Sequence, residues 1–141
     1  MDLATGQSRV LTDEPGIANI TNVSPDGRWV IYQCNVNAQM DLHAVSLEGG
    51  PPRAVVATPG QDYHPFVSPS GRWLYFHLNH KNLWRVPGPA QDWKAAEPVQ
   101  VTFFPESGLW LEDIKASPDG KKLLYSRGHT SSDLWLLKLN D

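Results

Sequence analysis

The chain alternates between short apolar runs and clusters of turn-forming residues, and the same arrangement occurs three times. VSPDGRWVIY at 23–32 returns as VSPSGRWLYF at 67–76 and as ASPDGKKLLY at 116–125. In each copy Ser-Pro-(Asp/Ser)-Gly predicts a tight turn, because proline fixes φ at about −65° in the second position and glycine suits the fourth. Runs rich in β-branched and aromatic residues flank each turn, which predicts a β-hairpin in every copy.

Two further strands are predicted in the repeats. DLHAVSL (41–47), NLWRVPG (82–88) and DLWLLKL (133–139) alternate in polarity with a period of two, which is typical of a strand. PRAVVA (52–57) and PVQVT (98–102) predict a fourth strand in the first two repeats. No stretch carries a convincing 3.6-residue apolar stripe, so the sequence predicts an all-β chain with four antiparallel strands per repeat.

The spacing of the turns supports the same architecture. Pro25, Pro69 and Pro118 recur at spacings of 44 and 49 residues, and a period in the forties fits a four-stranded propeller blade. We interpret residues 1–141 as a single β-propeller unit, half a propeller in size. Its repeats are approximately 13–57, 58–102, and 103–141 together with 1–12.

The repeat also carries a family resemblance. SPDGRWVIY…DLHAVSLEGGPPRAV resembles the blade repeat of TolB-like propellers, and RVLT (9–12) and VQVT (99–102) resemble its final strand. The resemblance covers nearly the whole chain and implies β-propeller blades of four antiparallel strands, three blades per chain. It implies a fold and no particular activity, because such blades occur in many unrelated proteins.

The third repeat is one strand short. Residues 110–139 supply three strands, whereas LATGQSRVLT (3–12) has the pattern of the end of a third strand followed by a fourth. Three blades do not close a ring, since propellers typically use four to eight. We therefore expect a homodimer that closes a six-bladed ring, with residues 3–12 of each chain completing the last blade of the other. Alternatively, the chain is a fragment of a longer gene product, and this interpretation is compatible with the homodimer.

Composition excludes several classes of partner. The chain has 141 residues and a net charge of −3, and it has no basic tract for nucleic acid. No apolar segment approaches the roughly 20 residues that insertion into a membrane requires, and the first residues do not form a signal peptide. The single cysteine, Cys34, excludes an intramolecular disulfide and is expected to be buried. The resemblance implies a periplasmic protein, with the cytoplasm as the alternative.

No catalytic motif is present. A nucleophile elbow, a His-Glu-x-x-His pair and a glycine-rich phosphate loop are all missing, so we expect no catalytic residues, no cofactor and no metal site. GHTSSD (128–133) is interpreted as a polar loop and not as a catalytic triad. His43 occupies a packing position of the repeat, and the strand alternation gives no reason for His77 and His80 to converge.

The starts of the first strands are expected to line one end of the central channel, where they form candidate contacts for a ligand, peptide or metal. The alternative is that these polar groups satisfy backbone amides at the rim, and TolB-like repeats often have Asp there. The candidate mouth residues are Asn19, Tyr63, His64, Glu112 and Asp113.

Two longer connections carry aromatic residues outside the repeat positions. They are expected to be exposed, as a partner-contact surface or as the closure seam of the ring. These residues are Trp93, Phe103, Phe104 and Trp110. Trp29 and Trp73, by contrast, share one repeat position and are expected to pack between blades.

These features favour a non-enzymatic scaffold for protein–protein interaction that assembles with a second copy and takes a protein or peptide at the channel mouth. Two alternatives remain open, both from enzymes with similar blades. One is the substrate-gating propeller of a serine peptidase of the tricorn or prolyl-oligopeptidase type. The other is a propeller lyase of the oligogalacturonate type, which needs a histidine-rich metal site in the channel.

Overall fold

The chain forms three antiparallel sheets side by side. The computed structural model describes residues 3–36, 38–128 and 132–138. In each sheet the strands follow one another in chain order. The first sheet contains β1 (Ala18–Val23), β2 (Trp29–Cys34), β3 (Asp41–Ser46) and β4 (Arg53–Val56). The second contains β5 (Asp62–Val67), β6 (Trp73–Leu78), β7 (Asn82–Pro87) and β8 (Val99–Gln100). The third contains β9 (Trp110–Ala116), β10 (Lys122–Gly128) and β11 (Ser132–Lys138).

The predicted all-β class and the hairpin in each repeat are confirmed. One short 3-10 helix, η1 (Pro89–Gln91), was not expected and lies in the long connection between β7 and β8. The strand predicted within residues 3–12 is not formed by the single chain, where this segment has no regular structure beyond a turn. No helix among the described residues is long and apolar enough to cross a membrane.

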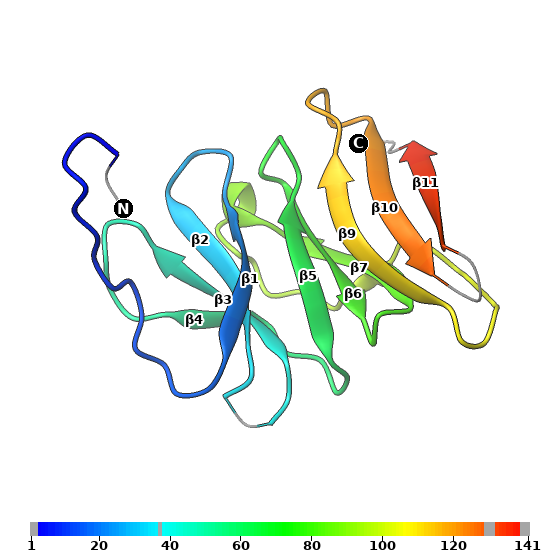
Figure 1. Cartoon of the computed structure of the whole chain (residues 1–141), viewed down its shortest axis with the longest axis horizontal. Coiled ribbons are helices and arrows are strands. Elements are labelled where there is room, and N and C mark those ends of the chain that lie inside the picture. Colours follow the sequence, from blue (N-terminus) through cyan, green and yellow to red (C-terminus); the bar gives the residue numbers. More distant parts are fainter. Residues whose placement is uncertain (1–2, 37, 129–131, 139–141) are drawn as a thin grey trace.

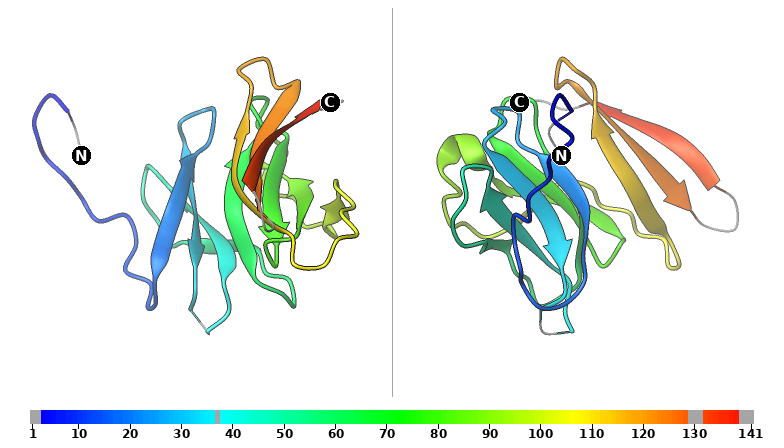
Figure 2. Two further views of the ribbon diagram at one scale, coloured as in Figure 1. Left: turned by 45° about the vertical axis from the view of Figure 1, so that its right-hand side comes forward. Right: turned by 60° about the vertical axis from the view of Figure 1, so that its left-hand side comes forward.

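The three sheets pack side by side and diverge from one another on the side of their outer strands (Figure 1). Their first strands, β1, β5 and β9, lie next to one another along one side (Figure 1). Residues 3–12 lie on the side of the first sheet that faces away from the other two sheets, far from β11 at the other end of the molecule (Figure 2). The inner strands thus form one side of the structure, and the two end sheets each leave one broad face without a neighbouring sheet.

Apolar clusters fill the spaces between the sheets. The first joins the first and second sheets through Ile31, Leu42, Leu74 and Phe76, which are all fully buried. The second joins the second and third sheets and has Leu123 among its buried members. In the strands that contribute to these clusters, side chains alternate between the two faces of the sheet, which is why the period of two in the sequence predicts the core.

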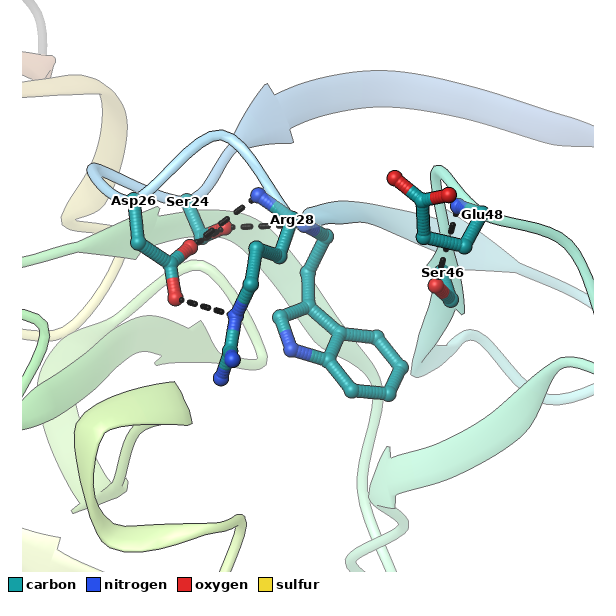
Figure 3. A network of polar contacts seen from close by, with 6 residues as sticks. Ser24, Asp26, Arg28, Ser46 and Glu48 are labelled. Carbon is teal, nitrogen blue, oxygen red and sulfur yellow. Dashed lines mark hydrogen bonds and ion pairs between the residues drawn. The ribbon is translucent and has the colours of Figure 1, made fainter.

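The three repeated turns share one hydrogen-bond pattern. The hydroxyl of Ser24 accepts a hydrogen bond from the backbone N–H of Trp29 at 2.9 Å and donates to Asp26 at 2.5 Å (Figure 3). The hydroxyl of Ser68 accepts from the N–H of Trp73 at 3.1 Å, and that of Ser117 from the N–H of Lys122 at 3.0 Å. The serine of the repeat therefore closes the hairpin through its side chain, which explains its recurrence.

The second turn lies deeper than the third, and this difference is testable. Ser68 is fully buried, so Ser68→Ala leaves the N–H of Trp73 without its side-chain acceptor and without water. We expect the free energy of unfolding to fall by about 1 to 3 kcal/mol. Ser117→Ala is the matched control, because water can replace its hydroxyl in that more open turn, and its expected cost is below about 1 kcal/mol. Urea unfolding of both variants measures the difference, and equal costs would contradict this account.

The segment just before β1 is held against the first sheet. Glu14 accepts from the hydroxyl of Tyr32 and lies 2.8 Å from Nδ1 of His43. Burial, followed by this contact with Glu14, raises the pKa of Tyr32. Cys34 is fully buried beside these groups, as expected, and burial raises the pKa of its thiol. His43 therefore has the structural role that its repeat position predicts.

Candidate functional site

A cluster of three histidines lies in the second sheet and includes His64, one of the candidate mouth residues. His64 comes from β5, His77 from β6 and His80 from the turn that follows β6. One ring nitrogen from each can be chosen so that all three atoms lie within 4.8 Å of one another. The ring centroid of His64 is 5.5 Å from that of His77 and 5.6 Å from that of His80.

A β-bulge places His64 in the cluster. Between the pairs Tyr63–His77 and Phe66–Tyr75, β5 has one residue more than β6. His64 lies in this bulge with a φ of 53°, and its N–H donates to the side-chain oxygen of Gln33 at 3.0 Å. Bulges re-aim side chains in this way and occur often beside functional sites.

A tight turn places His80. Asn79 and His80 both have positive φ, 53° and 54°, and the N–H of Lys81 donates to the carbonyl of Leu78 at 3.2 Å. This is the geometry of a type I′ hairpin turn. The carbonyl of His80 accepts from the N–H of Leu111 at 2.6 Å, so the turn is also tied to β9 of the third sheet. The imidazole of His80 stacks on Tyr63 with a centroid distance of 3.8 Å.

His77 is the deepest member of the cluster. It is fully buried, and neither of its ring nitrogens has a hydrogen-bond partner among the described residues. Burial, then the nearby His64 and His80, lower the pKa of His77 to about 3. The nearby backbone of Leu111 acts on this pKa in the opposite direction. The ring is therefore neutral at physiological pH, with a nitrogen lone pair in a dry site.

The charge around the cluster comes from β9. Burial, then His80, lower the pKa of His64, whereas Glu112 and Asp113 act in the opposite direction. Asp113 has a φ of 50° in the irregular part of β9, which corresponds to the bulge that carries His64. The imidazoles of the second sheet thus lie beside carboxylates of the third.

The candidate mouth residues are only partly brought together. Tyr63 and His64 form part of the histidine cluster, and Glu112 and Asp113 lie near enough to influence His64. Asn19 is exposed on β1, where it pairs with Gln33. The expectation that His77 and His80 do not converge on one site is wrong. It was based on the alternation of side chains along a regular strand, which takes no account of the bulge at His64 or of the turn at His80.

The sequence does contain a signal for this cluster. Val67 pairs with Leu74 across the Ser-Pro turn. If pairing continued from there without a bulge, His64 would face His77 directly across the hairpin. Register counting from the predicted turn could therefore have brought two of the three histidines together.

The four aromatic residues of the long connections differ in exposure. Phe103 is 74% exposed and Trp110 is 39% exposed, as expected for a contact surface. The expected exposure of Trp93 and Phe104 is wrong. Trp93 packs edge-on against Trp29 at 5.8 Å, and Phe104 packs on Tyr125 at 6.1 Å.

These half-buried aromatics pack within and between the repeats. The guanidinium of Arg53 lies 4.5 Å from the ring of Trp29 and 5.7 Å from that of Trp93, so the connection between β7 and β8 seals the contact with the first sheet. The expected packing role of Trp29 is confirmed.

Of the predicted polar loop GHTSSD, residues 129–131 lie outside the described residues.

Comparisons with known proteins bear on the fold. No family model and no curated protein matches the chain. TolB from Acinetobacter baumannii is similar in structure, with a TM-score of 0.76 and 16% identity over 96% of this chain and 33% of TolB. A puromycin hydrolase has a TM-score of 0.68 and 17% identity over 92% of this chain and 22% of the hydrolase. An oligogalacturonate lyase from Vibrio parahaemolyticus has a TM-score of 0.60 and 17% identity over 83% of this chain and 31% of the lyase.

At these identities the likeness concerns the fold. The chain spans about a third or less of the length of each of these solved structures. They include a TolB protein and two enzymes, so the fold does not select an activity. The three antiparallel sheets and the match over 96% of this chain agree with the resemblance in the repeat sequence. The chain therefore has the TolB-like β-propeller fold.

Proposed function

We propose that the chain is a non-enzymatic scaffold for protein–protein interaction that assembles by exchanging a strand with a second copy of itself. One observation carries this proposal: among the described residues, the third sheet has three strands where the other two have four. Among the described residues, β11 pairs only with β10, so its other edge presents unpaired backbone groups. Such edges readily accept an added strand.

Residues 3–12 of a second copy suit this edge. Their end, SRVLT, has the pattern of the segment that includes β8 in the second sheet, VQVT. In the single chain Leu3 is 90% exposed and Val10 is 82% exposed, so neither side chain is engaged in a core. On the acceptor side Trp135 and Leu136 are 44% and 64% exposed. Burying these apolar groups together favours the pairing.

Two copies joined at both ends would form a six-bladed ring. Two sheet-to-sheet contacts of this kind bury on the order of 2,000 to 3,000 Å², which is in the range of obligate dimers. Phe103 and Trp110 remain proposed contacts for a further protein. A protein or peptide bound at the channel mouth is a proposal of the same kind.

The solution mass tests the assembly. The chain has a mass of 15.7 kDa, and light scattering is expected to give twice this value over a range of concentrations. A stable species with the mass of one chain would overturn the proposal. Because the interface adds backbone pairing to apolar burial, moderate salt should not dissociate the dimer.

A second candidate is an accessory propeller segment of an enzyme. The observation that favours it is the likeness to the puromycin hydrolase and to the oligogalacturonate lyase. An α/β-hydrolase domain encoded in the same gene would support a role beside a peptidase. Cleavage of oligogalacturonate by the purified chain would support the lyase and would contradict the non-enzymatic proposal.

A further inference from the structure

We propose that His64, His77 and His80 bind a divalent transition-metal ion, with Zn²⁺ as the best fit. The site lies within the second sheet of one protomer, so the inference is independent of the self-association proposed above. It also differs from the expectation drawn from the sequence, which included no metal site.

The donor atoms are close to the required arrangement. Zinc binds imidazole nitrogens at about 2.0 to 2.1 Å, so two ligand nitrogens of a tetrahedral site lie about 3.3 Å apart. The candidate nitrogens lie within 4.8 Å of one another. Small rotations of the side chains would close this difference, and His64 and His80 are only half-buried.

His77 gives the independent sign of a ligand. A buried imidazole with both nitrogens unpaired loses its hydrogen bonds to water and gains none from the protein, so it destabilises the folded state. Native structures satisfy nearly all such groups, so each exception calls for a partner that the protein chain does not supply. Both nitrogens of His77 are such exceptions among the described residues, and its ring lies against His64 and His80. A metal ion bound by one nitrogen would give the buried His77 ring a partner that the described residues do not supply.

Packing alone does not explain the cluster. The stack of His80 on Tyr63 accounts for those two rings as an aromatic contact. This stack provides no hydrogen bond to His77. A leucine or phenylalanine at position 77 would fill a similar space without leaving a nitrogen unpaired. A purely structural role therefore does not account for a histidine at position 77.

The backbone fixes the ligands in place. His64 lies in a bulge held by the side chain of Gln33 at 3.0 Å, and His80 lies in a turn tied to Leu111 at 2.6 Å. Both histidines have positive φ, a conformation that costs free energy in residues other than glycine and concentrates at functional sites. Supporting contacts of this kind orient metal ligands and raise affinity.

Ligand chemistry selects the ion. Imidazole donors suit Zn²⁺, Cu²⁺, Ni²⁺ and Fe²⁺ better than Mg²⁺ or Ca²⁺, which prefer oxygen. Three protein ligands leave one tetrahedral position for water or an exogenous ligand. On the β9 side Glu112 and Asp113 add negative charge, of which Lys115 offsets a part. The two carboxylates outnumber the one ammonium group, so the net charge there favours a cation.

The test is metal binding by the full chain, free of any histidine tag and stripped with a chelator. Titration calorimetry with Zn²⁺ is expected to show one ion per chain, whether the chain is monomeric or dimeric. Co²⁺ is expected to give the intense visible absorption of a tetrahedral site. His80→Ala changes a half-buried turn residue and should weaken Zn²⁺ binding by about 100-fold. His77→Leu keeps the core apolar and should abolish binding while leaving the strand circular dichroism unchanged.

His43→Gln is the matched control, because His43 is also buried but pairs with Glu14 in the first sheet. It should bind Zn²⁺ as tightly as the wild type. The inference is wrong if the wild-type chain binds no ion, or if His80→Ala binds as tightly as the wild type. Equal weakening by His43→Gln and His80→Ala would likewise mean that the ion is not held by this cluster.

Discussion

Replacing Phe76 by alanine is expected to lower the free energy of unfolding by about 3 to 5 kcal/mol. Phe76 is fully buried in β6, within the cluster that joins the first and second sheets. The substitution removes a ring from a packed interior and leaves a cavity between two sheets, where the backbone ladders limit any collapse. Since whole domains are stable by only about 5 to 15 kcal/mol, this is a large share of the total.

Urea unfolding followed by tryptophan fluorescence measures this effect. Phe103→Ala is the control, because Phe103 is 74% exposed and its truncation should change the stability by less than about 0.5 kcal/mol. If Phe76→Ala does not fold, Phe76→Leu provides a milder test, with an expected cost of less than about 1.5 kcal/mol. An unfolding midpoint unchanged by Phe76→Ala would mean that the first and second sheets are not joined by this core.

Removal of residues 1–10 is expected to convert the dimer into a folded monomer. Within the protomer residues 3–10 are all exposed, so their loss removes little of the packing of the first sheet. Leu11 and Glu14, which contact that sheet, are retained. The deletion instead removes most of the strand proposed to complete the third sheet of the partner, so the effect falls on association.

A synthetic peptide of residues 3–12 provides the complementary test. Added to the shortened chain, it should occupy the free edge of β11 and raise the melting temperature, because a ligand that binds only the folded state stabilises it. A peptide with Val10 and Leu11 replaced by proline is the matched control, since proline cannot donate to the ladder. A shortened chain that remains dimeric would contradict strand exchange.

Much of the fold could be predicted from the sequence. The serine–proline turns and the alternation of apolar residues are local signals, and each depends on contacts between residues a few positions apart. They predict the three hairpins and the third strands, and the structure confirms them. The fourth strands were harder to predict, because β8 is only two residues long and outer strands have little apolar surface to bury.

The candidate site was less predictable. Tyr63 and His64 were identified from their place at the start of β5, but His77 and His80 were not. A bulge at His64 and a left-handed turn at His80 bring the three histidines together. Each depends on contacts of the backbone with a neighbouring sheet, such as the hydrogen bond from the N–H of His64 to the side chain of Gln33. Exposure of aromatics was misjudged for the same reason, since Trp93 is covered by residues of the first sheet, distant in the sequence.

The sequence by itself determined the repeat, the strand class and the turn of each hairpin, because side-chain alternation and turn chemistry act over short distances along the chain. Only the tertiary structure decided which polar residues share one site. The position of His80 depends on a turn fixed by its contact with Leu111, and the burial of His77 depends on the packing of whole sheets. Contacts between distant segments leave no periodic signal in the sequence, so the complete cluster of three histidines becomes visible only when the sheets are assembled.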